Sequence, residues 1–454
     1  MKRFYLTISL LLAIVLGGCS DQPNVLATAI SQIDDSTHIE QLHDYDSPYT
    51  ICYKNKNDTY SMYIFASPIQ YKIDTGYEII DNTVIESSDP NYAYENKANS
   101  IKTYFPSSLS NSFKVVSEGD FLEFLVQEDV TDFSEAKQEM FTNMYGDIVS
   151  AVIYERKNID MVFYPTKAGI KSEIVIKEKS ANKSFIYSVK SNGKSYENKQ
   201  NGYILFKNSE INAGLIYQPL VKYKIKGEEN IDISTKMEII EKGDGYVLEI
   251  ILNPDIMKGG ETIYPIKFDP SFELYQNKMP DTSVYSKFDT NSYLRHYAII
   301  GEHPTMGEGW EYLRFRLNWF MALDSTKITN AKFYIRNLSN SKSKNILQLF
   351  EMDEDWSSIK MLWSTRKTNF EDYIEKDILN NKLVEFDITN FVKSSFADKT
   401  WQEESNGLLF KLKNKSSFAI LSTSDNSLYP HYIKFQTKVL PTVFAPRESI
   451  NPQS

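Results

Sequence analysis

The chain has 454 residues, of which 41% are hydrophobic and 24% are charged, with 18 Gly and 16 Pro. This composition excludes a fibrous or wholly disordered chain and predicts a globular protein of about two domains. Acidic residues outnumber basic ones by 60 to 50, and no basic stripe is dense enough to neutralise a run of phosphates. A nucleic-acid partner is therefore not expected. The aromatic content of 13% favours β-strands over long polar helices.

The N-terminus has the features of a secretory signal. Lys2 and Arg3 precede an apolar run over residues 4–16, which is shorter than the roughly 20 residues of a membrane-spanning helix. The run ends in Leu16-Gly17-Gly18-Cys19, which resembles the lipobox of bacterial lipoproteins. We therefore expect a signal peptide over residues 1–18, lipidation of Cys19, and attachment to the outer face of the cell membrane of a Gram-positive bacterium. An ordinary signal peptide that happens to contain a cysteine is the alternative.

The next segments predict a tether and a first β-rich domain. Residues 19–47 are polar and lack a sustained period, which predicts a flexible tether. From residue 48 to residue 272 the chain predicts antiparallel strands, because segments of period-2 alternation are separated by turn residues. These segments are 60–65, 121–126, 159–163, 174–176, 203–206 and 246–252. The strand over 159–163, the turn over 167–169 and the returning residues Ile170, Ile174 and Ile176 predict a hairpin. Cys52 has no partner once Cys19 is lipidated, so we expect a small buried residue of a strand.

Two helices are expected among the strands. Residues 132–144 carry apolar side chains near i, i+4 spacing, which predicts a short surface helix. Asp387 is placed to cap a second helix whose apolar residues lie on one face.

The second domain is predicted over residues 273–440. Pro265 and Pro270 interrupt an alternating strand and mark the boundary with the first domain. The strand spacing beyond it is typical of sandwiches and jelly rolls, so the expected fold is mostly β, with two antiparallel domains and a jelly-roll-like β-sandwich as the second. Residues 441–454 are expected to form a disordered tail.

Catalytic and metal motifs are missing from the sequence. It contains no Gly-x-Ser-x-Gly elbow, no His-Glu-x-x-His pair and no phosphate loop, so an enzyme is not expected. A glycosidase would need two carboxylates in one cleft, which spacing in sequence cannot reveal. The acidic cluster Asp353-Glu354-Asp355 suits Ca²⁺ but lacks the spacing of a defined calcium loop. We therefore expect a charged turn there, and no metal or cofactor.

All the tryptophans lie in the second domain, at positions 310, 319, 356, 363 and 401. Binding modules stack the C–H face of a sugar on exposed indoles that have polar neighbours. Trp356 and Trp363 are expected to pack in the core. Trp310 and Trp401 are expected at the surface, and together with Tyr312 they are the predicted carbohydrate-binding residues.

Several motifs of the second domain occur in a familiar order: Asp281-Thr282-Ser283-Val284, Tyr312-Leu313-Arg314-Phe315, Ile328-Thr329-Asn330-Ala331, Glu354-Asp355-Trp356 with Leu362-Trp363, Phe386-Asp387-Ile388-Thr389 and Asn406-Gly407-Leu408-Leu409. In this order they resemble the DNRLRE domain, a β-sandwich of bacterial surface proteins that is related to carbohydrate-binding modules. Ser422-Thr423-Ser424 stands where that family has a Ser-Arg-Glu-like run. The closing strands are therefore the least well predicted.

The first domain carries three further motifs: Tyr94-Glu95-Asn96-Lys97-Ala98-Asn99-Ser100, Asp160-Met161-Val162-Phe163-Tyr164 with Gly169-Ile170-Lys171, and Tyr264-Pro265 with Asp269-Pro270. They resemble the segment that precedes the DNRLRE domain in wall-associated, Rhs-repeat proteins of Gram-positive bacteria. The repeats and the C-terminal toxin of such proteins have no counterpart after residue 440, so toxin activity is not expected.

These observations predict a non-catalytic surface lipoprotein. Its expected partners are the membrane, through the N-terminal lipid, and a cell-wall or extracellular polysaccharide, through the second domain. The alternative is a structural or display stem, related to the Rhs-type proteins, that contacts proteins rather than sugar.

Overall fold

The computed structural model describes residue 33 and residues 36–443, except 128–129, 146, 180–183, 194, 200–202, 209–210, 233–234, 259–261, 275–280, 293–296, 305, 315–320, 323–324, 340–344, 353, 355, 359, 369, 371, 380–381, 398–406, 415, 425, 427–428 and 441. Most described residues lie in antiparallel strands, and the predicted β class is confirmed. The helices of this part are α2 (Pro254–Lys258), α3 (Thr389–Ala397), and the short 3-10 segments η1 (His43–Tyr45) and η3 (Ser325–Lys327).

The first half of the molecule is built from two sheets. One runs in the order β21-β22-β15-β10-β9-β8-β7-β6. Its strands are β6 (Asp81–Glu86), β7 (Tyr94–Ala98), β8 (Lys102–Phe105), β9 (Phe113–Ser117), β10 (Asp120–Val126), β15 (Ser184–Ser191), β21 (Lys236–Lys242) and β22 (Gly245–Ile251).

The other sheet runs in the order β11-β12-β13-β14-β24-β18-β17-β16, and β19, β20 and β23 pair beside it. Its strands are β11 (Lys137–Thr142), β12 (Ile148–Glu155), β13 (Ile159–Pro165), β14 (Gly169–Ile176), β16 (Ser195–Lys199), β17 (Tyr203–Asn208), β18 (Ile211–Tyr217), β19 (Val221–Ile225), β20 (Glu228–Asp232), β23 (Thr262–Phe268) and β24 (Ser271–Leu274). The expected hairpin is confirmed, since β13 and β14 pair from Ile159↔Ile176 to Pro165↔Ile170.

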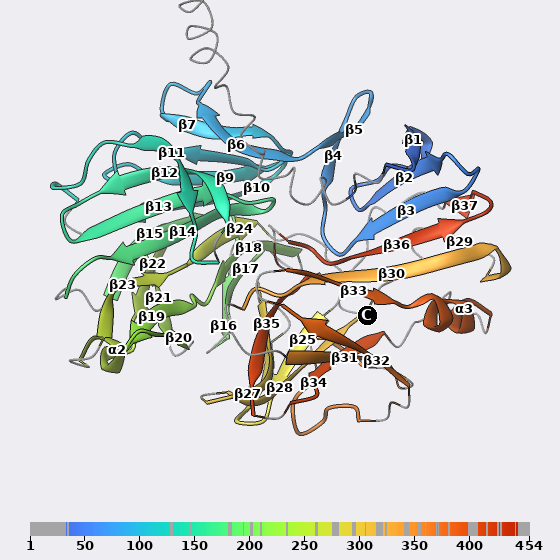
Figure 1. Cartoon of the computed structure of the whole chain (residues 1–454). Helices are drawn as coiled ribbons and strands as arrows, with labels where there is room; N and C mark the ends of the chain where they lie inside the picture. The colour runs from blue at the N-terminus through green and yellow to red at the C-terminus, as the bar shows by residue number, and fades with distance from the viewer. Residues whose placement is uncertain are drawn as a thin grey trace, which may run out of the picture.

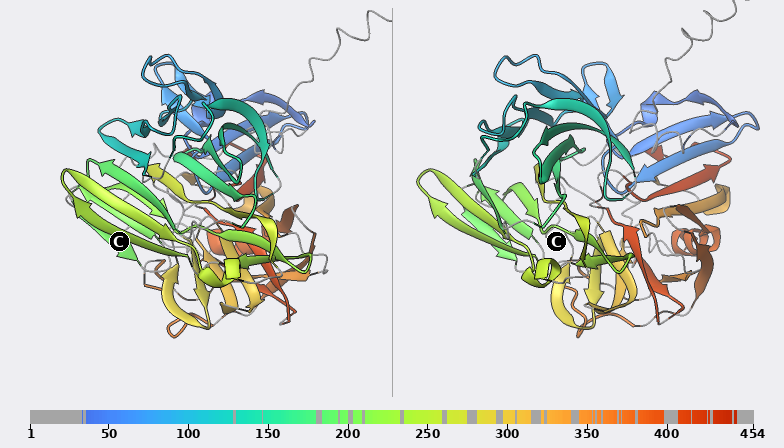
Figure 2. Two further views of the ribbon diagram at one scale, coloured as in Figure 1. Left: turned by 90° about the vertical axis from the view of Figure 1, so that its left-hand side faces the viewer. Right: turned by 60° about the vertical axis from the view of Figure 1, so that its left-hand side comes forward.

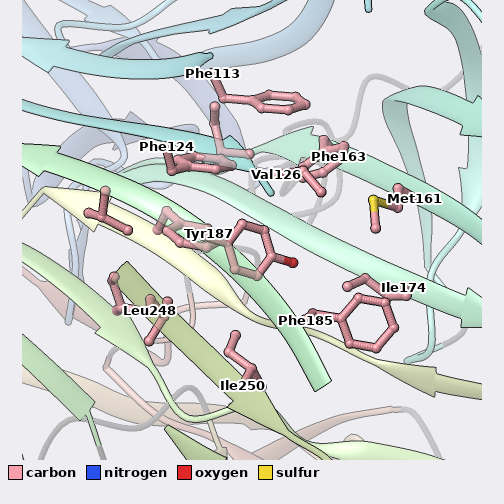
Figure 3. Packing of buried hydrophobic residues seen from close by; sticks show 14 of the residues in the cluster. Phe113, Phe124, Val126, Met161, Phe163, Ile174, Phe185, Tyr187, Leu248 and Ile250 are labelled. Atoms are coloured by element: carbon pink, nitrogen blue, oxygen red, sulfur yellow. The ribbon is translucent and has the colours of Figure 1, made fainter. Parts of the chain in front are cut away.

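A large aromatic core lies between these two sheets. Phe113 and Phe124 come from the first sheet, and Phe163 and Phe272 come from the second. Phe124 stacks on Phe272 with ring centres 3.9 Å apart, and Phe113 lies 4.1 Å from Phe163. Figure 3 shows the labelled members of this core gathered between the strands. Burial of such large rings is the main source of stability in a half that contains no described disulfide.

The predicted surface helix over residues 132–144 is wrong. Residues Lys137–Thr142 instead form the edge strand β11, which pairs with β12 in the register Met140↔Ser150. Most side chains of β11 are exposed. The strand therefore forms because β12 supplies its hydrogen-bonding partners, a long-range effect that overrides a weak local period.

The second half is a sandwich of two sheets. The larger sheet runs in the order β26-β25-β28-β34-β31-β32, with β27 and β35 paired beside it. Its strands are β25 (Asp281–Tyr285), β26 (Phe288–Ser292), β27 (Tyr297–His303), β28 (Gly307–Leu313), β31 (Asn345–Glu351), β32 (Tyr373–Ile378), β34 (Leu408–Leu412) and β35 (Phe418–Ser422).

The smaller sheet of this sandwich joins both ends of the chain. Its order is β1-β2-β3-β36-β30-β33, with β1 (His38–Gln41), β2 (Thr50–Asn55), β3 (Tyr60–Phe65), β30 (Ile328–Arg336), β33 (Leu383–Asp387) and β36 (Tyr432–Thr437). Figure 1 shows the blue strands β1 to β3 beside the red β36 and the orange β30. Two small pairs complete the described strands, β4 (Gln70–Ile73) with β5 (Gly76–Ile79), and β29 (Met321–Ala322) with β37 (Thr442–Val443).

This pairing differs from the boundaries expected from the sequence. Residues 38–47 were expected in the tether and residues 48–65 in the first domain, yet β1, β2 and β3 belong to the second sandwich. Cys52, buried as expected, shares the sandwich core with Phe333 and Phe410. The tether residues up to 32, the signal peptide and most of the expected tail lie outside the described residues. The division into two domains itself stays a prediction.

The two halves lie side by side (Figure 2) and share a small core. Met144 and Tyr145, at the tip of the β11–β12 hairpin, pack with residues of the second half such as Tyr285 and Tyr429. Beside them, Arg336 donates to Asp147 at 3.3 Å, with the side chains 14% and 8% exposed. The hairpin tip therefore connects the first half to the sandwich.

Candidate functional site

Trp310 and Tyr312 lie on the outer face of β28, pointing away from the sandwich core. Their strand neighbour Leu313 points inward, because side chains alternate along a strand. The expectation that Trp310 is exposed is wrong, since its side chain is 5% exposed and that of Tyr312 is fully buried. Both belong to an outer aromatic cluster that we define as Val284, Trp310, Tyr312, Phe350, Met352, Trp356, Met361 and Leu409, with Trp363 and Phe370 at its margin.

The segment between β31 and β32 covers this outer aromatic cluster. Trp356 is buried as expected, whereas Trp363 is half-buried. The hydroxyl of Tyr312 donates to the Lys367 carbonyl at 2.7 Å, and burial raises the pKa of Tyr312. These contacts hold the covering segment on the sheet. The alternation of residues along β28 does not predict that this segment covers its outer face.

Two cations cover the Trp310 ring. The Lys411 ammonium lies 4.1 Å from its centre, and the Arg366 guanidinium carbon lies 4.9 Å from it. The indole N–H donates to Glu308 at 2.9 Å. Cation–π contacts of this kind stabilise a ring but leave little of its face open to a ligand. Sugar contact by Trp310 and Tyr312 stays a prediction from the sequence that their burial does not favour. Trp401, the third predicted residue, lies outside the described residues.

An open cleft of about 730 Å³ lies at the margin of the sandwich, where β32 and β33 end their respective sheets. Helix α3 forms one wall of the cleft. The lining residues come from β30, β31, the start of β32 and the residue before it, β33 and α3. They are Thr329, Asn330, Glu351, Asp372, Tyr373, Ile374, Asp387, Thr389, Asn390, Phe391 and Ser394. We call this feature the α3 cleft.

The local sequence explains how α3 takes its place. Asp387 Oδ1 accepts hydrogen bonds from the backbone N–H of Thr389, at 3.0 Å, and from its hydroxyl, at 2.6 Å. The predicted helix and its Asp387 cap are therefore confirmed. The hydrogen bond from the Thr389 hydroxyl lowers the pKa of Asp387, so its carboxylate is charged at neutral pH. The cap sets the first turn of α3 beside the cleft.

The α3 cleft combines an aromatic surface with polar groups of several kinds. Tyr373 is 51% exposed, which is high for so large a side chain, and its ring can receive the apolar face of a ligand. Asn330 and Asn390 supply amides, and Asp372 supplies an exposed carboxylate. Groups of these types can both donate to and accept from hydroxyls.

A series of ring contacts connects the α3 cleft with the outer aromatic cluster. Tyr373 lies 5.2 Å from Phe350, Phe350 lies 4.6 Å from Phe370, and Phe370 lies 6.1 Å from Trp310. Trp310 is thus the buried end of this series and Tyr373 is its exposed end. Sequence reasoning missed Tyr373 because it considered tryptophans first. The polar residues that flank this ring, Asp372 and Glu375, were the available signal.

The described residues contain neither a cluster of metal-ligating side chains nor a helix of membrane-spanning character. No group of three or more His, Cys, Asp or Glu residues among them is placed to hold a metal ion. Of the acidic cluster considered for Ca²⁺, Asp353 and Asp355 lie outside the described part. No helix in the described ranges has both the length and the apolar composition that a bilayer requires.

Comparison with known proteins finds curated relatives, solved structures and a matching family model. Over 421 residues the chain is 21% identical to the "tRNA nuclease WapA" of Bacillus subtilis strain 168, and over 423 residues it is 21% identical to the "tRNA(Glu)-specific nuclease WapA" of Bacillus subtilis subsp. natto strain BEST195. Each alignment covers 85% of this chain but only 17% of the relative. The chain therefore spans about a sixth of the length of these curated relatives.

Among solved structures, an exo-beta-1,3-galactanase from Phanerochaete chrysosporium aligns with 82% of this chain and 100% of its own, at 5% identity and a TM-score of 0.15. That score supports no argument about fold or function. The family comparison concerns the second sandwich, where residues 275–434, about a third of the chain, match the model of carbohydrate-binding module family 96.

Proposed function

We propose that the second sandwich is a non-catalytic module that binds cell-wall or extracellular polysaccharide in the α3 cleft. The match of residues 275–434 to a carbohydrate-binding family supports the class of ligand. The DNRLRE resemblance concerns the same residues and favours the same class. The observation that carries the proposal is the exposed ring of Tyr373 in a cleft lined by amides, hydroxyls and carboxylates.

The chemistry of this lining suits a sugar. One face of a pyranose ring carries C–H groups that pack on an aromatic ring, while its hydroxyls need both donors and acceptors. Tyr373 provides the ring, and Asn330, Asn390 and Asp372 provide the polar groups. The cleft is open to solvent along the margin of the sandwich, so a polymer can lie in it without a free chain end. Trp310 and Tyr312 lie in the outer aromatic cluster beside the α3 cleft. Trp310 contacts Phe370, which packs on Phe350 beneath Tyr373, so the cluster supports the ring of Tyr373.

A retention experiment on insoluble polysaccharides tests the proposal. The purified chain is mixed with cell walls and with a panel of insoluble glycans, and the bound fraction is measured against concentration. We expect saturable binding that falls at least tenfold in Tyr373→Ala and is kept in Tyr373→Phe, because sugar–aromatic stacking needs the ring rather than its hydroxyl.

Tyr71→Ala is the matched control. Tyr71 is a partly exposed tyrosine on the β4–β5 hairpin, outside the sandwich, and its hydroxyl donates to Glu78 at 2.7 Å. Its removal should leave retention unchanged. Absence of retention on every glycan, or an equal loss in both alanine variants, would contradict the proposed site.

The location of the protein is a second part of the proposal. We propose that lipid at Cys19 holds the mature chain on the outer face of the membrane. Lipid chains anchor by apolar burial, at about 0.8 kcal/mol per CH₂ group. Cys19→Ser should therefore shift the protein from the membrane pellet to the culture medium. Equal amounts of wild type and variant in the pellet would contradict lipidation.

The display-stem alternative has one specific observation in its favour. The similarity to the WapA proteins covers 85% of the chain, so it includes the first half as well as the sandwich. A stem predicts protein partners after crosslinking on cells, with retention on glycans absent. The nuclease activity in the names of these relatives is not proposed here, because the excess of acidic over basic residues disfavours phosphate contacts.

A further inference from the structure

Two sequence motifs of the first half, the one with Lys171 and the one with Asp269, lie in contact in the folded chain. Neither takes part in the proposed glycan binding. Lys171 lies on β14, and Asp269 lies between β23 and β24, both of which pair with β14. The Lys171 ammonium nitrogen lies 2.8 Å from Asp269 Oδ2. Their side chains are only 5% and 3% exposed. An amine and a carboxyl group are therefore held in contact on neighbouring strands, away from solvent.

We propose that Lys171 and Asp269 form an intramolecular amide bond after folding. The neutral amine nitrogen Nζ attacks Cγ of the neutral carboxyl group. The new bond is Nζ–Cγ, and the bond that breaks is Cγ–Oδ2. Oδ2 leaves as one water molecule, with the carboxyl proton and one proton from Nζ. The reaction is a condensation, so it needs no oxidant and no further reactant.

The distances around Asp269 match this reaction. A nitrogen at hydrogen-bond distance from a carboxyl oxygen is near the attack range of about 3–3.5 Å from the carbon. The Leu220 N–H donates to Oδ1 at 2.8 Å, which is where negative charge develops in the tetrahedral intermediate. The Tyr145 hydroxyl donates to Oδ2, the leaving oxygen, at 2.5 Å. Each oxygen therefore has a donor suited to its role.

Both reacting side chains are almost completely buried, which keeps water away from the reacting atoms. The Tyr145 ring, 5.2 Å from Nζ, helps to enclose the pair. Exclusion of water also slows hydrolysis of the amide once it forms.

A neighbouring ion pair provides a comparison within the same sheet. Lys267 Nζ lies 2.8 Å from Glu173 Oε1, and Glu173 Oε2 accepts the Met144 N–H at 2.6 Å. Its lysine side chain is 23% exposed. In the described part of the chain no hydroxyl donates to Glu173. The lysine of this pair is more exposed than Lys171, and its carboxylate has no described hydroxyl as proton donor, so it should stay an ion pair.

The mass of the intact denatured protein tests the proposal. We expect a mass lower than that of the sequence by one water, and a proteolytic product that joins the peptide of Lys171 to that of Asp269. Lys171→Arg keeps a positive charge but removes the nucleophilic amine, so it should have the full mass. Tyr145→Phe keeps both reacting groups and should form the bond at least tenfold more slowly after refolding.

Lys267→Arg is the matched control and should retain the loss of one water. Circular dichroism shows whether each variant is folded. The mass of the wild-type protein tests the proposal even if a variant fails to fold. The full sequence mass in wild-type protein after long incubation in the folded state would overturn the proposal. A crosslinked peptide at Lys267 and Glu173 instead would also overturn it.

Discussion

Met62 of β3 lies directly opposite Phe435 of β36, and both side chains are buried in one core. The two ends of the described chain are thus neighbours in the sandwich, and the first half of the molecule is inserted between them. The family match begins at residue 275, so it does not include β1, β2 or β3. Strands β2 and β3 nevertheless supply core side chains, Cys52, Met62 and Ile64, to the proposed glycan-binding module.

The insertion predicts that a mutation in β3 destabilises the second half. Ile64 is fully buried opposite Ile433, so Ile64→Ala should lower the free energy of unfolding by about 3 kcal/mol, the usual cost of a cavity in a core. All the tryptophans lie beyond residue 300, so their fluorescence in a urea titration reports the second half. Ile148→Ala, at a 56% exposed residue, should change the free energy by less than about 0.5 kcal/mol. An unchanged midpoint in Ile64→Ala would show that β3 is not part of the sandwich.

The contact between the halves predicts a dependence on pH. Arg336 contacts Asp147, and its guanidinium carbon lies 4.0 Å from the centre of the Tyr429 ring. Arg336→Ala should cost about 3 kcal/mol at neutral pH, because it leaves the Asp147 carboxylate buried without its cation. Thermal or urea unfolding of the two proteins measures this difference.

The sign of the pH effect follows from Asp147. Burial raises the pKa of Asp147, whereas Tyr429 and Arg336 act in the opposite direction. The folded chain therefore binds this proton more tightly than the unfolded chain, and stability falls as pH rises through the folded pKa. Loss of Arg336 raises that pKa further, so the variant should be less destabilised near about pH 4 than near about pH 7. In an Asp147→Asn background the effect of Arg336→Ala should no longer depend on pH.

The charge of the α3 cleft predicts selectivity between glycans. Its described lining contains the carboxylates of Glu351, Asp372 and Asp387 and no lysine or arginine. A polyuronate should therefore bind more weakly than a neutral glycan of the same linkage. Asp372→Asn should reduce that difference by about threefold, the size expected for an exposed charge. Affinity electrophoresis at low and high salt measures the difference in affinity between the two glycans. An equal difference in wild type and in Asp372→Asn would contradict the role of Asp372.

The burial of Trp310 predicts that its replacement lowers the stability of the protein but not its binding to glycan. Trp310→Phe removes the hydrogen bond to Glu308 and weakens the contacts with Lys411 and Arg366, so it should lower the free energy of unfolding by about 2 kcal/mol. Retention on the preferred glycan should stay within twofold of wild type. Circular dichroism and the retention assay measure the two effects. Lost retention with unchanged stability would instead make Trp310 a direct sugar contact.

Local pattern alone was enough for several features. Period-2 alternation predicted β3 and the β13–β14 hairpin, and Asp387 predicted the start of α3, because each of these depends on neighbours within a few residues. The β class and the burial of Cys52 follow in the same way from composition and alternation.

Tertiary structure decided which surfaces are covered and which strands pair. The alternation of β28 places Trp310 on the outer face, but only the segment between β31 and β32 and the cations Arg366 and Lys411 bury it. Likewise β11 is a strand because β12 lies beside it, and Tyr373 borders a cleft because α3 and β30 lie next to β32. A clear local alternation predicts a strand and its two faces, as it did for β3 and β13, since these arise from local backbone geometry. The partner of each strand and the exposure of each face depend on contacts between distant residues, which local pattern does not contain.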